Sequence, residues 1–509
     1  MEGGRGESVF RWRRTSLGVR SSSATAPLLV LLLLAGCLAP GPSGDAPRAG
    51  AQPPAYAPDC SIATAGWAQG CAARASSTAG SKTELWAAVN PTDPRNVVLG
   101  AKDLNPDSTP NCVWNGLFVT KDGGRTWRDV VIGGRYADRG PTSPFFGYAC
   151  NTDPMFAFAP DGTLFFNVEL YEFGGEATRE TPGTREFTNR SQLGSKLLLA
   201  ASFDGGLTWP RLALQDVGDG PIVFHDYSRM AVSPVTGTVF TFINTFTDAG
   251  AFGSVLASRD GARTVAPPVK VTPREDPGSA FSTGVAVAPS GRVVVAQTAG
   301  FSPIASGNPG ILYVAHSDDD GRSFTNPREV LRYSAMDPRL ANVQFRAGTF
   351  VQIAYDLSSG PHAGRLYAAW ADAAGPAARI VVASSDDDGL TWSAPVPVKN
   401  GTRAHDQFHP SLVVDDRGDV HVAFFDREFD PQNKLLDVTH AWSQDGGATW
   451  SHHRLTTRSF DGDLGVHQDG FPFIGDYLGL AAAGDDVWIG YPDTTSGEAV
   501  AAAIRVVRS

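Results

Sequence analysis

Several features that would indicate common protein classes are missing from this sequence. It contains no run of basic residues and carries a net charge of −11, so nothing in it favours nucleic-acid binding. Cys-x-x-Cys pairs and mixed Cys/His spacings are absent, which excludes the usual zinc modules. Stretches with a helical period are scarce. What is present is glycine (56), proline (36) and 42% hydrophobic residues, a composition typical of a globular protein built from strands and turns.

Long hydrophobic runs are also lacking, and the apolar run at residues 27–34 is too short to cross a bilayer. It follows a basic segment with Arg11, Arg13 and Arg14, and this combination is typical of an export signal. The run ends in Leu-Ala-Gly-Cys, which resembles the lipobox of bacterial lipoproteins and implies cleavage before Cys37 and lipidation of that residue. An ordinary secretory signal and a twin-arginine signal remain alternatives.

These boundaries divide the chain into three predicted parts. Residues 1–36 are the signal peptide, residues 37–58 are a lipidated tether rich in proline, alanine and glycine, and residues 59–509 are the folded domain. We therefore expect an exported protein that is lipid-anchored to the bacterial cell envelope and faces outside the cytoplasm. We expect a monomer that meets the membrane only through its lipid.

Cysteine is sparse, with five in 509 residues, and one of these is the predicted lipidation site. Four cysteines in an exported domain favour two disulfides. We prefer the pairs Cys60–Cys71 and Cys112–Cys150, although the sequence permits three pairings.

One octapeptide pattern, Ser/Thr-x-Asp-x-Gly-x-Thr/Ser-aromatic, occurs six times. Only the third copy departs from it, with Ala262 in place of glycine and Val265 in place of the aromatic residue. Successive copies lie 56 to 82 residues apart, which indicates one supersecondary unit used many times. The aspartates that the copies share are Asp122, Asp204, Asp260, Asp319, Asp387 and Asp445.

The chemistry of the octapeptide predicts a structural corner. The aspartate can accept backbone N–H groups of its own turn, the glycine can take a positive φ, and the aromatic residue can pack beneath the turn. A calcium loop of the EF-hand type needs a glutamate that no copy supplies. Six copies also argue against a catalytic role, because an enzyme needs one site.

The octapeptide resembles the Asp box, or bacterial neuraminidase repeat, of the sialidase-type β-propellers. This resemblance implies an all-β fold of four-stranded blades, with each box between the third and fourth strands. A seventh unit without a box begins near residue 477. We predict seven blades, with six as the alternative, and a strand between residues 60 and 85 that closes the ring.

In such a fold the loops opposite the boxes surround the mouth of the channel, where propellers usually bind ligands. Polar side chains recur where the predicted inner strands begin and where the second strands end, and we expect them to converge on this mouth. Carboxylates and histidines of this kind can also hold a divalent metal such as calcium. The candidate binding residues are His225, Asp226, Tyr227, Asp406, His409, Asp426, His467, Asp469 and Asp493.

The family resemblance implies hydrolysis of the exo-α-sialidase type. That chemistry uses a tyrosine nucleophile helped by a glutamate, an aspartate as acid and base, and a three-arginine clamp for the substrate carboxylate. The candidate catalytic residues are Tyr477, Asp476, Asp153, Arg229, Arg346 and Arg427. The Arg-Ile-Pro motif of the family is missing, and no glutamate is evident near the tyrosine in sequence. We predict recognition or hydrolysis of an extracellular glycan or glycoprotein, with a non-catalytic glycan- or protein-binding propeller as the alternative.

Overall fold

The structure is a computed structural model. It describes residues 67–104, 113–134, 140–146, 148, 150–173, 177–181, 184–187, 193–215, 223–247, 250–273, 280–299, 309–348, 350–400, 405–468 and 471–508. The signal peptide, Cys37 and the tether lie outside these residues and stay predictions. In the described ranges, no helix is long and apolar enough to span a membrane.

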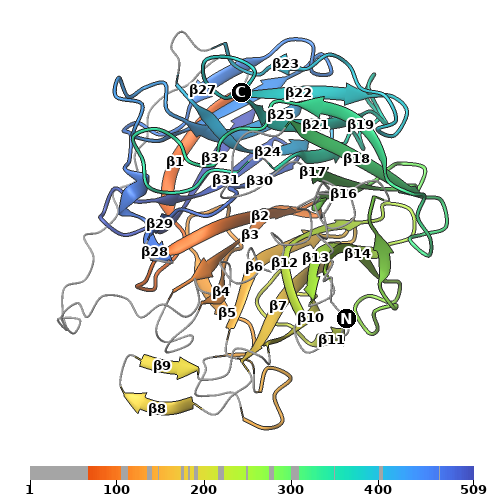
Figure 1. The fold of residues 1–509 in the computed structure, drawn as a ribbon, viewed down its shortest axis with the longest axis vertical. Coiled ribbons are helices and arrows are strands. Elements are labelled where there is room, and N and C mark those ends of the chain that lie inside the picture. The colour runs from red at the N-terminus through yellow and green to blue at the C-terminus, as the bar shows by residue number, and fades with distance from the viewer. Residues whose placement is uncertain are drawn as a thin grey trace, which may run out of the picture.

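Seven four-stranded antiparallel sheets form the blades of a propeller, and their inner strands neighbour one another around a closed ring (Figure 1). The prediction of seven blades is confirmed. Blade 1 is β2 (Lys82–Asn90), β3 (Asp93–Asp103), β4 (Trp114–Thr120) and β5 (Arg128–Val131). Blade 2 is β6 (Cys150–Phe158), β7 (Leu164–Phe173), β10 (Leu193–Ser202) and β11 (Arg211–Gln215). Blade 3 is β12 (Val223–Val232), β13 (Val239–Thr247), β14 (Gly250–Ser258) and β15 (Val269–Val271).

The remaining blades follow the same order from the axis outward. Blade 4 is β16 (Phe281–Val287), β17 (Val293–Ala299), β18 (Gly310–Ser317) and β19 (Arg328–Tyr333). Blade 5 is β20 (Gln352–Tyr355), β21 (Leu366–Asp372), β22 (Arg379–Ser385) and β23 (Val396–Pro397). Blade 6 is β24 (Gln407–Val414), β25 (Val420–Asp426), β26 (Asp437–Ser443) and β27 (Ser451–Arg454). Blade 7 is β30 (Gly479–Ala483), β31 (Asp486–Asp493), β32 (Val500–Arg508) and β1 (Trp67–Arg74).

Among the described residues, two hairpins and one 3-10 helix lie outside the blades. A hairpin of β8 (Ala177–Thr181) and β9 (Thr184–Phe187) follows β7, and the 3-10 helix η2 (Gly462–Leu464) precedes a hairpin of β28 (Val466–Gln468) and β29 (Phe471–Phe473). The middle strands of the blades are buried along nearly their whole length, as in β25 and β31. Each sheet packs against a neighbour on both faces, so its strands are apolar runs without a clean inside–outside alternation.

The six octapeptides form the turns between third and fourth strands, as predicted. In the copy at residues 385–392, Asp387 accepts hydrogen bonds from the backbone N–H (2.8 Å) and hydroxyl (2.7 Å) of Thr391 and from the hydroxyl of Ser385 (2.8 Å). Two successive residues, Asp388 and Gly389, take a positive φ, where the sequence predicted only the glycine. In the third copy the second of these positions is Ala262, with φ 61°.

The N-terminal strand β1 closes the ring. It pairs antiparallel with β32 from Trp67↔Arg508 to Arg74↔Ala502, so the two ends of the described chain share blade 7. This confirms the predicted closing strand between residues 60 and 85. Closure leaves no open edge between the first and last blades, which is how a propeller avoids exposing an unpaired strand.

A chain of three buried histidines crosses blade 6 beside this closing strand. His421 Nδ1 lies 3.0 Å from His440 Nε2, and His440 Nδ1 lies 3.2 Å from His453 Nε2. The indole of Trp67 packs edge-on against His421, with ring centroids 4.8 Å apart. Burial lowers the pKa of His440 well below its usual value and lowers that of His453 to about 4.

These histidines make the fold sensitive to mild acid. Because the pKa values of His440 and His453 are lower in the folded than in the unfolded chain, the unfolded chain binds more protons, and stability is lost as the pH falls from about 6.5 to about 4. For His453 alone, the loss is about 3 kcal/mol by pH 4. We expect urea unfolding at pH 7.5, 6 and 4.5 to show a smaller acid loss in His453→Gln than in the wild type. The matched variant His362→Gln should keep the wild-type loss, and an equal loss in His453→Gln would contradict the prediction.

The described cysteines bear on one predicted disulfide. Cys150, at the start of β6, is fully buried and disulfide-bonded. Cys60 and Cys112 lie outside the described residues, so the pairs Cys60–Cys71 and Cys112–Cys150 stay predictions.

Candidate functional site

The inner strands of four blades share a local distortion near their first residues. In β2, β6, β12 and β24 a β-bulge interrupts the pairing with the second strand. The first residue of each bulge has a positive φ: Glu84 (53°), Asp153 (52°), Tyr227 (58°) and His409 (50°). Positive φ is uncommon for residues other than glycine, and such positions concentrate at functional sites. The bulges break the side-chain alternation of the strand, so polar side chains from different blades can meet near the axis.

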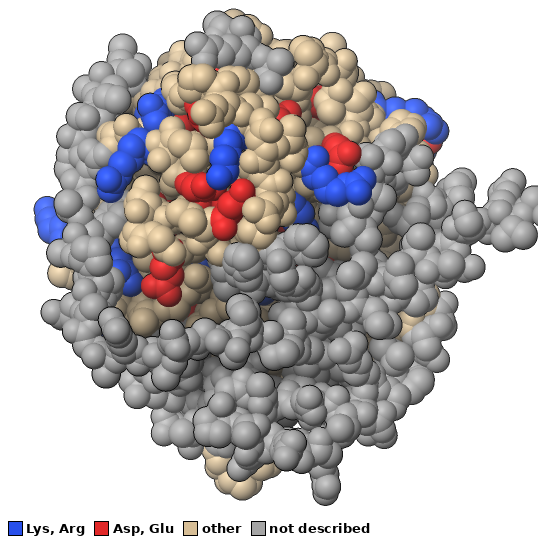
Figure 2. All heavy atoms as spheres, turned by 60° about the vertical axis from the view of Figure 1, so that its left-hand side comes forward, with Lys and Arg blue, Asp and Glu red and all other residues tan. Residues whose placement is uncertain are grey.

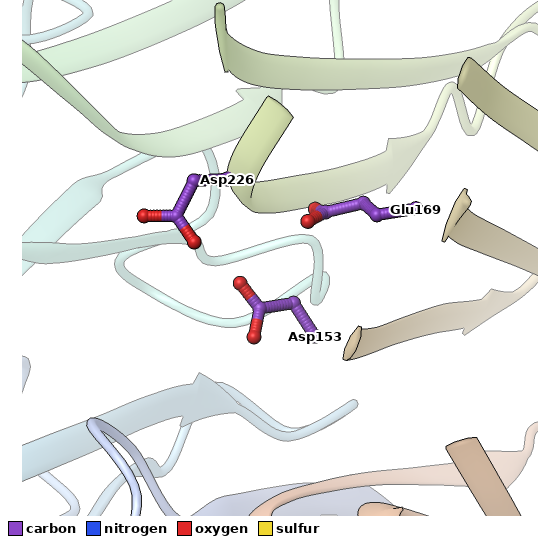
Figure 3. Close-up of side chains that lie close together, drawn as sticks. All are labelled: Asp153, Glu169 and Asp226. Atoms are coloured by element: carbon purple, nitrogen blue, oxygen red, sulfur yellow. The ribbon is translucent and has the colours of Figure 1, made fainter. Parts of the chain in front are cut away.

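Three carboxylates meet at the centre of this region. Asp153 of β6, Glu169 of β7 and Asp226 of β12 each place one oxygen within 4.8 Å of the other two, and Figure 3 shows the three groups facing one another. Asp153 accepts the backbone N–H of Tyr227 (2.9 Å), and Glu169 accepts the backbone N–H of Ser228 (3.0 Å). Asp226 is half-buried, and its backbone oxygen accepts a hydrogen bond from Nδ2 of Asn244 (3.2 Å), whereas no described residue donates to its carboxylate.

The electrostatics of this cluster separate one carboxylate from the others. Burial, and then the charge of Asp153, raise the pKa of Glu84, Glu169 and Asp226 well above their usual values. Burial also raises the pKa of Asp153, but the charge of Lys102 and hydrogen bonds with Glu84 and the Tyr227 N–H bring it below its usual value. The Nζ atom of Lys102 lies 2.9 Å from Oε2 of Glu84. One ionised carboxylate therefore lies among three that favour their protonated form.

An aromatic layer adjoins the carboxylates. The ring of Tyr227 stacks on Phe350 with centroids 4.2 Å apart, and Tyr477 packs edge-on against both Tyr227 and Trp86 at 6.0 Å. The guanidinium carbon of Arg229 lies 3.6 Å from the centre of the Tyr227 ring. Arg229 is thus held by cation–π contacts, and its Nε and Nη2 atoms have no hydrogen-bond partner among the described residues.

The hydroxyl of Tyr477 lies close enough to the carboxylates for their charges to act on it. Burial is the largest of the causes that raise the pKa of the Tyr477 hydroxyl well above its usual value. The charges of Asp153 and Glu84 raise this pKa further, and Glu169 makes a smaller contribution in the same direction. The hydroxyl is buried and has no hydrogen-bond partner among the described residues. The sequence showed no glutamate near this tyrosine, and the fold supplies two from other blades.

Arg346 and Asp476 form an ion pair at the same mouth. The guanidinium binds the carboxylate in two-pronged fashion, with Nε–Oδ1 at 3.1 Å and Nη2–Oδ2 at 2.6 Å. His409 accepts the backbone N–H of Gly348 (3.2 Å), and burial lowers its pKa to about 4. His409 is therefore neutral near pH 7 and cannot supply positive charge to the site.

Other predicted residues have partners elsewhere. Arg427 pairs with Asp406 (3.2 Å) and donates to the backbone oxygen of Ala341 (2.6 Å). Because Arg427 is bound there and Arg229 is stacked on Tyr227, the three predicted arginines do not form a common clamp.

The remaining candidates make local contacts. Nδ1 of His225 lies 2.7 Å from the hydroxyl of Ser195, Asp426 pairs with Lys399 at 2.5 Å, and Asp493 accepts the N–H of Thr495 at 2.8 Å. The side chain of His467 and all of Asp469 lie outside the described residues.

Sequence reasoning missed three charged residues of the site: Glu84, Lys102 and Glu169. All three lie within strands and are buried. A charged residue inside an otherwise apolar strand, as in TLFFNVEL, was the available signal, because such a residue is rarely buried without a partner or a role.

The described part of the surface in Figure 2 shows no large basic patch of the kind that binds nucleic acid. On the face seen in Figure 2, acidic and basic side chains lie interspersed and form no large area of one sign. This agrees with the absence of a basic run in the sequence.

Part of the chain is similar to a known repeat family. Residues 253–461 match the BNR repeat-like domain. This segment contains the boxes of Asp260, Asp319, Asp387 and Asp445. A search of curated proteins finds no significant match.

Solved structures of propellers are similar to this chain at low identity. The Hadza microbial sialidase Hz136 has a TM-score of 0.44 and 15% identity, covering 81% of this chain and 76% of its own. A protein of unknown function from Dyadobacter fermentans has a TM-score of 0.44 and 14% identity, with coverages of 84% and 95%. The NanB sialidase of Streptococcus pneumoniae has a TM-score of 0.42 and 11% identity, with coverages of 85% and 69%. These identities are too low to carry an activity from one protein to another.

Proposed function

We propose that this chain hydrolyses a glycosidic bond in an extracellular glycan, with Tyr477 as a sialidase-like nucleophile. The observation that carries the proposal is the hydroxyl of Tyr477, which is buried without a partner near the carboxyl groups of Glu84, Asp153 and Glu169. A tyrosine served by a glutamate and an aspartate is the nucleophile arrangement of sialidases, an exception among glycosidases. The predicted export and lipid anchor at Cys37 would place the site where such glycans occur.

The geometry supports a division of roles. Tyr477 attacks the anomeric carbon while Asp153, the ionised carboxylate of the cluster, accepts the phenolic proton. The glycosidic C–O bond breaks in the same step, and the departing oxygen takes a proton from Glu84 or Glu169, which favour their protonated form. Water then cleaves the glycosyl–tyrosine bond, and the two displacements together retain the anomeric configuration. Since the phenolic oxygen is buried, a glycoside can reach it only if a neighbouring side chain moves.

The substrate class follows from the charges at the mouth. Five carboxylates (Glu84, Asp153, Glu169, Asp226 and Asp476) lie near three cations (Lys102, Arg229 and Arg346), and Arg346 is already paired. A substrate carboxylate therefore meets no assembled arginine clamp. We expect neutral aryl glycosides to be turned over faster than an aryl sialoside.

The test is hydrolysis of a panel of aryl glycosides, including an aryl sialoside, by the full chain. We expect release of the aryl group from at least one glycoside, with proton NMR showing retained anomeric configuration in the first product. Inversion would exclude the tyrosine nucleophile.

A binding propeller without catalysis is the second candidate. It is favoured by the burial of the Tyr477 oxygen and by the pairing of Arg346 with Asp476. Saturable glycan binding measured by calorimetry, with no turnover of any panel member, would replace hydrolysis by this function.

A further inference from the structure

We propose that Asp153, Glu169 and Asp226 form a binding site for a hard divalent cation of the calcium type. The three carboxylates come from β6, β7 and β12, so the site joins blades 2 and 3 at the axis (Figure 3). The proposal of this site rests on the geometry of the three carboxylates and does not depend on the proposed glycoside hydrolysis.

The spacing of the oxygens fits a common cation. One oxygen from each carboxylate lies within 4.8 Å of the others. Calcium binds oxygen at about 2.3–2.6 Å, so ligands on opposite sides of the ion lie up to about 5 Å apart. Magnesium at about 2.1 Å requires a span of about 4.2 Å or less and a stricter octahedral geometry. Carboxylates without histidine or cysteine also favour such cations over zinc or copper.

The carboxylates of Asp153 and Glu169 are held in place by the backbone. The N–H groups of Tyr227 and Ser228 donate to them, and the hydroxyl of Tyr171 also donates to Glu169 (3.1 Å). Hydrogen bonds of this kind orient metal ligands and leave lone pairs free for the ion. The carboxylate of Asp226 accepts no hydrogen bond from any described residue, so it is available to complete the site.

A second observation points to a ligand at this place. Tyr477 lies in the segment that leads into β30 of blade 7 and is more than nine-tenths buried. Its hydroxyl has no partner in the described ranges and is close enough to Asp153 and Glu169 for their charges to act on it. A buried hydroxyl without a partner costs about 1–3 kcal/mol, and a cation or its bound water would satisfy it. Lys102 is paired with Glu84, so its ammonium group does not take the place of a cation between the three carboxylates.

The test is a calorimetric titration of calcium chloride into the full chain after removal of metals with a chelator. We expect one site that binds calcium more tightly than magnesium, and at least about a tenfold loss of calcium affinity in Asp226→Asn. Asp226 is the variant of choice because it is half-buried and its carboxylate accepts no hydrogen bond from a described residue. Its described hydrogen bond, from Asn244 to the backbone oxygen, is kept in the variant, so the replacement does not disturb the fold. Asp416→Asn, an exposed aspartate in the β24–β25 turn, should keep the wild-type affinity.

Thermal unfolding with and without calcium gives an independent measurement. A cation that binds only the folded chain raises the melting temperature of the wild type and of Asp416→Asn, but not of Asp226→Asn. The proposal is overturned if the wild type shows no binding at millimolar calcium, or if Asp226→Asn binds as tightly as the wild type. No glycan is present in either experiment, so failure here leaves the proposed hydrolysis to its own test.

Discussion

Tyr477→Phe is expected to lower kcat on the best glycoside of the panel by about 10²–10⁴-fold. The change removes only the phenolic oxygen and keeps the ring that packs against Tyr227 and Trp86. Because this oxygen has no described partner, its removal costs no hydrogen bond and should raise the free energy of unfolding by about 1 kcal/mol. Loss of activity with a gain of stability is the pattern of a residue kept for function.

A matched tyrosine provides the control. Tyr333, on the outer strand β19, also has a buried hydroxyl, but it lies away from the axial carboxylates. Tyr333→Phe should leave kcat unchanged within about twofold, because it makes the same chemical change outside the site. Equal turnover by Tyr477→Phe and the wild type would remove the nucleophile from the proposed mechanism, and urea unfolding of both variants would show whether stability changed as expected.

Trp67→Ala should destabilise the propeller by about 3–5 kcal/mol. Trp67 is fully buried at the start of β1, where it packs against His421 and within the apolar core shared by blades 5 to 7. Its loss leaves a cavity at the point where the first and last blades are joined. Urea unfolding at pH 7.5 measures the effect.

The control for this prediction is a truncation at the surface. Leu357→Ala removes an apolar side chain that is 53% exposed, and it should change stability by no more than about 0.5 kcal/mol. A loss below about 1 kcal/mol in Trp67→Ala would mean that β1 contributes little to closing the ring.

The fold was largely predictable because its signal is repeated and local. Each box is a turn whose aspartate bonds to residues four positions away or fewer, so eight residues are enough to reveal it. Strand lengths and glycine-containing turns then fix the blade, and the count of units fixes the number of blades. Closure by β1 was predictable because blade 7 lacked a fourth strand.

The site was predictable only in part. Asp153, Asp226, Arg346, Asp476 and Tyr477 were expected near the mouth, and the structure brings them together. Arg427 was also expected at the mouth. It follows the end of the second strand of blade 6, and its guanidinium instead pairs with Asp406 and donates to the backbone oxygen of Ala341. Glu84 and Glu169 were missed because both lie inside strands whose pattern reads as structural.

The sequence by itself determined the repeating unit, the all-β class and the corner role of the six aspartates, since these depend on contacts within a few residues. It favoured seven blades over six by the count of units, and the pairing of β1 with β32 decided that number. Only the tertiary structure decided which side chains share the axis. The reason is physical: a β-bulge at Glu84, Asp153, Tyr227 and His409 changes where a side chain points, and a bulge leaves no period in the sequence. Asp153 meets the N–H of Tyr227 across 74 residues and Arg346 meets Asp476 across 130 residues, so these contacts exist only once the blades have packed together.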